Sequence, residues 1–308
     1  KSKINILPTA TLTKNLEGTN MTEFGLLKGK GIVGFTDGVK TIQNTRLMSR
    51  IMKSAYDLDC LVMQHAEDFE LSINGLVNDG IIATKLGLTG IPDLAEKIII
   101  ERDLSLLEDY NCRYHISQIS SSKSIEVIKQ KKDNVNFTTA VSINNLSLNE
   151  NDIGDFKTFL KLSPPLRTEE DRLSLINGIN KDLIDVIVSD HKPEDEESKR
   201  ITFSQAATGA SGVETLLSLA LEMYHNDSVK LSKIIELVTS NPAKILKINK
   251  GNLSIGNEAD FCIVDLYKPW VVKKEKMHSK SKNTCIEDKK LQGLVTNTFV
   301  KGEELFKI

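Results

Sequence analysis

Short apolar runs alternate along the chain with longer segments in which apolar residues recur every three or four positions. The short runs are apolar on both faces, which is typical of parallel strands covered by helices. Strand–helix alternation of this kind predicts an α/β fold with a parallel sheet. The predicted strands are Lys3–Leu7, Gly31–Thr36, Cys60–Gln64, Cys112–Ser117, Asn136–Ser142 and Ile184–Ser189. The predicted helices are Thr45–Tyr56, Pro92–Tyr110, Ser122–Lys131, Glu169–Gly178, Gly212–His225 and Leu231–Val238.

The pattern changes near Lys250, where Gly and Asn turn residues precede a predicted strand at Asp260–Leu266. A hairpin turn is expected at Lys301-Gly302. We therefore expect two parts, a (β/α) barrel over 1–248 and a small C-terminal β-sandwich portion over 249–308. Because a closed (β/α)₈ barrel needs eight strands, the six predicted ones indicate an N-terminally truncated TIM-type barrel that starts near its third strand. An open six-stranded α/β sheet is the alternative.

Composition narrows the class of protein only slightly. The 308 residues are 40% apolar and 27% charged with a formal charge of -2, which is ordinary for a globular protein. Interspersed charges give no indication of nucleic-acid or membrane binding, and no apolar run reaches the ~18 residues of a membrane span. The four cysteines lack metal-type spacing, so we expect free thiols and a cytoplasmic location. A barrel that lacks two strands would expose two edges, so we expect poor independent stability.

Polar residues that can bind metal or carry protons follow several predicted strands. They are Asp37, His65, His115, Asn144-Asn145 and Asp190-His191. In (β/α)₈ enzymes the carboxyl ends of the strands carry the chemistry, and imidazole and carboxylate groups are zinc ligands. This pattern favours a zinc site with His65, His115 and Asp190 as ligands and Asp190 as the proton acceptor. The alternatives are structural histidines and an Asp190 that only caps the next segment.

Seven segments follow one another in the order typical of a known enzyme family. They are LPTATLTKNLEGTNMTEFGLLKGKGIVGFTDG, HAED, KLSPPLRTEEDR, SDHKP, GASGVETLLSLAL, TSNPAKIL and SKSKNT. With these segments the chain resembles the amidohydrolase superfamily and, within it, the class I dihydroorotases. The resemblance implies a barrel with a β-sandwich, and a reversible ring closure of N-carbamoyl-L-aspartate to dihydroorotate in pyrimidine biosynthesis. It also implies one or two Zn²⁺ ions, with one ion favoured here.

The resemblance also assigns roles by position. His65 and His115 match zinc ligands, and Asp190 matches the metal-bound acid/base. Thr208 and Gly209 match a loop whose backbone contacts the substrate ring. The substrate-binding positions include Ser163 and Glu194, and the substrate mouth is expected to include Lys161 and Arg167.

This chain departs from the family pattern at several of these positions. The metal-bridging Asp falls on Gly38, and Asp37 lies one residue away, where a strand turns the side chain to the other face. A carboxylate and two imidazoles of the family are replaced by Ala140 and Asn144-Asn145. Ser163 stands for an Asn, and Glu194 stands for a His. An acid at 194 would repel an anionic substrate.

Two functions are compatible with these departures. The first is an active dihydroorotase with a reduced zinc site, acting on a small molecule as a homo-oligomer. The second is a catalytically silent dihydroorotase-like protein that assembles with aspartate carbamoyltransferase. A hydantoinase or allantoinase relative is a third possibility, which the SPPLR and LTKNLEG segments disfavour. We expect the enzyme. A His-x-His pair before Lys1 would distinguish it from a partner protein.

Overall fold

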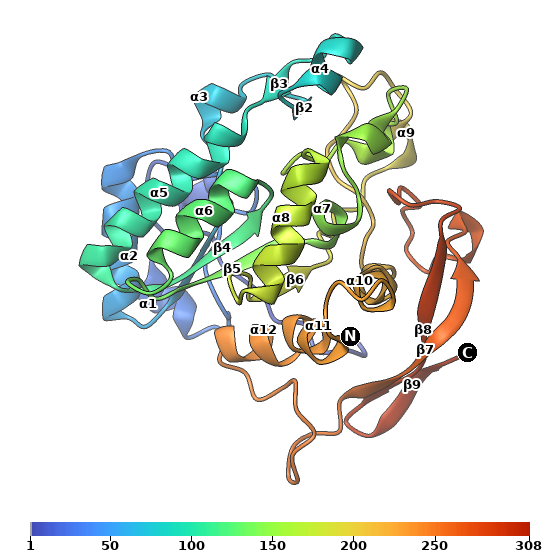
Figure 1. The fold of residues 1–308 in the computed structure, drawn as a ribbon. Helices are drawn as coiled ribbons and strands as arrows, with labels where there is room; N and C mark the ends of the chain where they lie inside the picture. Colours follow the sequence, from blue (N-terminus) through green and yellow to red (C-terminus); the bar gives the residue numbers. More distant parts are fainter. Residues whose placement is uncertain (1) are drawn as a thin grey trace.

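The computed structural model describes residues 2–308 and centres on a parallel sheet with the strand order β1-β4-β5-β6. The helices α5, α6 and α8 pack side by side along this sheet (Figure 1). The strands are β1 Leu61–Gln64, β4 Arg113–Ile119, β5 Phe137–Ser142 and β6 Val186–Val188, and the main helices are α2 Thr45–Asp57, α5 Asp93–Tyr110, α6 Ser122–Lys131 and α8 Glu169–Asn180. All eight lie where the apolar pattern predicts them.

Two further extended segments continue the sheet beyond β1. The Phe35 amide donates to the Leu61 carbonyl at 2.8 Å, and the Ala10 amide donates to the Gly34 carbonyl at 3.0 Å. Residues 8–10 and 33–35 therefore run parallel to β1, which brings the sheet to six segments. The predicted strand at Lys3–Leu7 is wrong, because Ile4 and its neighbours are exposed and the pairing begins at Pro8, which contributes only its carbonyl.

A buried carboxylate fastens helix α5 to the outer face of the sheet. Asp103 accepts hydrogen bonds from the Tyr114 hydroxyl at 2.6 Å and from the Arg102 Nε at 2.9 Å, and it also accepts from the Gln64 amide. Burial raises the pKa of Asp103, and these donors partly offset that effect. Because Tyr114 faces the helix, the next residue, His115, faces the opposite side of the sheet.

The second sheet is antiparallel and consists of β7 Phe261–Val271, β8 Lys290–Val300 and β9 Glu303–Lys307. The predicted turn at Lys301-Gly302 is confirmed, and its φ angles of 54° and 81° fit the tight turn of a hairpin. The sheet lies against α10 Leu216–His225, where the Ser218 hydroxyl donates to the Gly293 carbonyl at 2.6 Å (Figure 1). The division of the chain at residue 248 stays a prediction.

Shorter elements complete the described part of the chain. They are η1 Lys14–Leu16, α1 Phe24–Lys28, α3 Phe69–Ser72, β2 Val77–Asn78, α4 Ile81–Leu86, β3 Gly90–Ile91, α7 Ile143–Ser147, η2 Glu150–Ile153, η3 Thr158–Leu160, α9 Glu196–Lys199, α11 Leu231–Val238, α12 Ser240–Ile245 and η4 Lys274–Lys276. Within residues 2–308, no helix combines the length and the apolar character needed to cross a membrane. All four cysteines are free thiols, and Cys60 and Cys112 are buried.

Candidate active site

Asp190 lies two residues beyond β6, where side chains from three strands meet. The Gln118 Nε2 donates to its Oδ1 at 2.7 Å, and the Ser142 hydroxyl donates to its Oδ2 at 3.2 Å. The backbone of Asp190 has a φ of 49°, a left-handed conformation that is uncommon for residues other than glycine and clusters at functional sites. Burial raises the pKa of Asp190, and the hydrogen bonds from Gln118 and Ser142 lower it in part. The carboxyl group is therefore held in place by two donors, and its pKa lies above the ordinary value for Asp.

A strand irregularity brings Gln118 to this carboxyl group. The pairing of β4 with β5 shifts between Ile116 and Ile119, and such bulges re-aim side chains near functional sites. A carboxylate only accepts hydrogen bonds, so the amide of Gln118 must present its NH₂ group to Asp190. Gln118 was not among the predicted site residues, because the predicted strand ended at Ser117 whereas β4 continues to Ile119. Its position in the sequence could have indicated its role, because Gln118 lies nearer the carboxyl end of β4 than His115 does.

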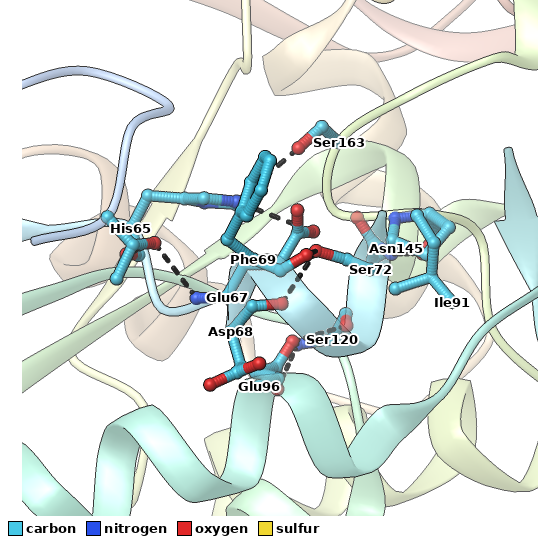
Figure 2. Close-up of polar contacts among 12 residues, drawn as sticks. His65, Glu67, Asp68, Phe69, Ser72, Ile91, Glu96, Ser120, Asn145 and Ser163 are labelled. Carbon is cyan, nitrogen blue, oxygen red and sulfur yellow. Dashed lines mark hydrogen bonds and ion pairs between the residues drawn. The ribbon is translucent and has the colours of Figure 1, made fainter. Parts of the chain in front are cut away.

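His65 follows β1 directly and is buried, with 2% of its surface exposed. Its Nε2 lies 3.4 Å from the Ser163 hydroxyl and 3.9 Å from a Glu67 oxygen (Figure 2). Its Nδ1 is buried without a hydrogen-bond partner. Burial raises the pKa of Glu67, but the hydrogen bond and charge of His65 outweigh it and leave that pKa low. His65 also contributes to lowering the pKa of Asp190.

His115 lies farther down the sheet than the sequence led us to expect. It pairs with Thr138, and its Nδ1 lies 2.8 Å from the Thr138 hydroxyl. Ser142, which bonds Asp190, comes four residues later on β5, or about 13 Å along a strand. Burial lowers the pKa of His115 to about 4, so the ring is neutral at neutral pH. The expectation that His65, His115 and Asp190 share one ion is not met by this geometry.

The donor groups of the site do not fit a zinc ion. Catalytic zinc sites use three protein ligands. Across residues 2–308 there is no group of three or more His, Cys, Asp or Glu side chains placed to hold a metal. Asp37 cannot serve, because its carboxylate accepts from the amides of Leu12 and Thr13 and from the Thr13 hydroxyl. The metal-binding side-chain types near the site are His65, the Glu67 carboxylate beside it, and Asp190.

The Thr208–Gly209 loop lies beside the segment that follows Asp190. His191 and Ala210 form a parallel bridge, which aligns the two segments. The Gly209 amide donates to the Lys161 carbonyl at 3.0 Å, and the Gly209 carbonyl accepts from the buried Lys199 Nζ at 2.9 Å. Gly209 has a φ of 136°, and a Cβ there would meet neighbouring backbone at 2.8 Å. The structure thus requires glycine at this position and fixes the loop firmly.

Glu194 joins this loop region to the segment at residues 279–282. The Ser281 hydroxyl donates to the Glu194 carbonyl at 2.7 Å, and the Glu194 carboxylate lies 3.7 Å from the Lys192 Nζ. Glu194, its neighbours and residues 279–282 line a cavity of about 440 Å³. The lysine offsets part of the repulsion that a carboxylate at this position would exert on an anion.

Arg167 has a structural position, contrary to the expectation that it lines the substrate mouth. Its side chain is buried, and its guanidinium group donates to the Ser120 hydroxyl at 3.1 Å and to the Asn78 Oδ1 at 2.8 Å. Ser120 in turn donates through its amide to Glu96 at 3.0 Å (Figure 2). Arg167 therefore ties the SPPLR segment to the protein interior.

Comparison with known proteins identifies the class. A description of the amidohydrolase family matches residues 12–305. The chain is 40% identical to a dihydroorotase of Ehrlichia chaffeensis, over 99% of this chain and 68% of that protein. It is 37% identical to a dihydroorotase of Syntrophus aciditrophicus, over 99% of this chain and 72% of that protein. The chain belongs to the amidohydrolase family and, within it, to the dihydroorotase group, as the sequence motifs predicted.

A solved structure supports the same fold. The L-hydantoinase from Arthrobacter aurescens superposes with a TM-score of 0.87 at 22% identity, covering 99% of this chain and 70% of that protein. At that identity the likeness concerns the fold alone. The mixed α/β architecture, with a parallel sheet and a C-terminal antiparallel sheet, is thereby confirmed as the amidohydrolase fold.

Proposed function

We infer that this chain is a hydrolase of cyclic amides that interconverts dihydroorotate and N-carbamoyl-L-aspartate, a step of pyrimidine biosynthesis. The observation that carries the proposal is the 40% identity to a dihydroorotase over nearly the whole chain. The position of Asp190 supports it, because a positioned carboxyl group at the carboxyl end of a parallel sheet is the expected place for proton transfer. The alternative of a silent assembly partner has no support among these named relatives.

Asp190 carries the proton in the proposed reaction. In the ring-opening direction, a water molecule attacks the carbonyl carbon of the ring amide, and the Asp190 carboxylate accepts the proton of that water. The same proton passes to the ring nitrogen as the C–N bond breaks, which leaves Asp190 ionised again. Ring closure follows the reverse path. A raised pKa suits this exchange because general acid–base groups work best when their pKa approaches the operating pH.

A donor for the developing oxyanion is available nearby. Asn144 is the second residue of α7, two residues beyond β5, which neighbours the strand that precedes Asp190. Its amide nitrogen is buried without a hydrogen-bond partner of good geometry, and Asn144 contributes to lowering the pKa of Asp190. A fixed N–H donor that has no other partner can stabilise negative charge on a carbonyl oxygen. We assign this role to Asn144. The substrate-contact roles of Ser163, Glu194, Thr208 and Gly209 belong to the same proposal.

The proposal contains no step through zinc. One or two Zn²⁺ ions follow from the family resemblance, but the described residues contain no group of three His, Cys, Asp or Glu side chains placed to hold a metal. The cytoplasmic location, a homo-oligomeric state and a complex with aspartate carbamoyltransferase also remain predictions. Co-purification and the molar mass in solution test the last two. The direct test of function is conversion of dihydroorotate by the purified chain, compared with its Asp190→Asn variant.

A further inference from the structure

Both oxygens of the Asp190 carboxylate are already taken by hydrogen-bond donors. Gln118 donates to Oδ1 at 2.7 Å, and Ser142 donates to Oδ2 at 3.2 Å. The Ser142 hydroxyl is fully buried and therefore has no water with which to exchange this bond. A cation that binds Asp190 would have to displace these donors and leave buried polar groups unpaired, which is unfavourable.

Gln118 also presents the wrong atom to a cation. Its NH₂ group faces Asp190, and an amide N–H is a donor with no lone pair to offer a metal. Apart from the Glu67 carboxylate near His65, the other polar groups of the site are amides and hydroxyls, such as Asn144 and Ser163. Zinc prefers thiolate, imidazole and carboxylate ligands. His65 keeps one free ring nitrogen, Nδ1, and the Glu67 carboxylate lies 3.9 Å from its Nε2. Even with these groups, the described residues contain no set of three His, Cys, Asp or Glu side chains placed to hold a metal.

We propose that residues 2–308 form a hydrogen-bonded carboxyl site that binds no zinc by themselves, and that Gln118 occupies the place beside Asp190 where a third metal ligand would be needed. Gln118→His would then create a zinc site from residue 118, His65 and Asp190. This proposal concerns the metal alone and goes beyond the proposed reaction. The chain can be zinc-free whether or not it turns over dihydroorotate.

The test is a zinc titration of the full chain, with calorimetry as the readout. A chelator first removes any bound metal. The wild type and Gln118→Leu, which removes the amide without adding a ligand, are expected to show no one-equivalent binding. Gln118→His is expected to bind one equivalent of zinc at least about 10-fold more tightly than the wild type does. The reason is that even partners outside the ligand shell change metal affinity by about 10- to 100-fold. That binding should disappear in the double variant that also carries His65→Ala.

The wild-type titration decides the proposal even when a variant fails to fold. One equivalent of zinc in the wild type, lost on Asp190→Asn or His65→Ala, overturns it. A Gln118→His protein that is folded by circular dichroism yet gains no zinc also overturns the assigned place of Gln118. Turnover is measured separately on the same samples. A wild type that binds no zinc and is inactive contradicts the proposed function but supports this inference. A wild type that binds zinc and is active supports the proposed function but contradicts this inference.

Discussion

The Gln118 amide and the Asp190 carboxylate lie 2.7 Å apart at the carboxyl end of the parallel sheet, although 72 residues separate them in the sequence. The contact depends on the bulge in β4, which turns Gln118 toward the strand that ends before Asp190. Gln118 makes a hydrogen bond to the Asp190 carboxylate at the place where a metal ligand would be needed. Hydrogen bonds to ionised groups are among the stronger hydrogen bonds in proteins. The pH dependence and the metal content of this protein both follow from this pair.

Removal of the Gln118 amide should shift the pH profile of ring opening. The amide N–H stabilises the ionised form of Asp190, so Gln118→Leu raises the pKa of that carboxyl group further. Ring opening needs the carboxylate, and its acidic limb should therefore move to higher pH. The measurement is kcat/KM against pH for wild type and variant. An acidic limb that stays in place, or moves to lower pH, would show that Asp190 is not the titrating base.

His115 should make the fold sensitive to acid. Its pKa is lowered from 6.5 to about 4 by burial, so the unfolded chain takes up a proton before the folded chain does. The contribution of His115 to the free energy of unfolding is fully present above about pH 6.5. It is lost as the pH falls toward 4, by up to about 3 kcal/mol. Urea unfolding of His115→Gln should show a weaker loss over this interval. His278→Gln, at an exposed position, is the matched control. Equal pH dependence in both variants would contradict this account.

The Asp103 network should contribute measurably to stability. Tyr114→Phe removes one donor from a fully buried carboxylate, which is expected to lower the free energy of unfolding by about 1–3 kcal/mol. Tyr56→Phe is the control, because Tyr56 is 59% exposed. Denaturant unfolding followed by circular dichroism measures both. Equal stability of the two variants would mean that the hydroxyl contributes nothing at Asp103.

The apolar pattern was sufficient for the central strands, because β1, β4 and β5 are short, largely buried segments with amphipathic helical segments between them. It failed at Lys3–Leu7, where alternating Ile4 and Ile6 face solvent and pairing starts only at Pro8. Alternation of this kind cannot report which segment finds a partner strand. Asp190 was found because it ends an apolar run.

The missed features of the site depend on long-range pairing. A bulge in β4 arises from its register with β5, and no local pattern around Gln118 reports that register. His115 was placed at the site because strand position was inferred from sequence, whereas the true register sets it beside Thr138. The burial of Arg167 likewise depends on Asn78 and Ser120, which are distant in the sequence.

The central claim is that this chain opens and closes the dihydroorotate ring through the carboxyl group of Asp190. The most direct test measures carbamoyl-aspartate formed from dihydroorotate by the wild type, by Asp190→Asn and by the exposed control Asp57→Asn on α2. We predict turnover by the wild type and the control, and a loss of about 10²- to 10⁴-fold in Asp190→Asn with the fold unchanged. A folded wild type without turnover, or an Asp190→Asn variant as active as the control, would contradict the account.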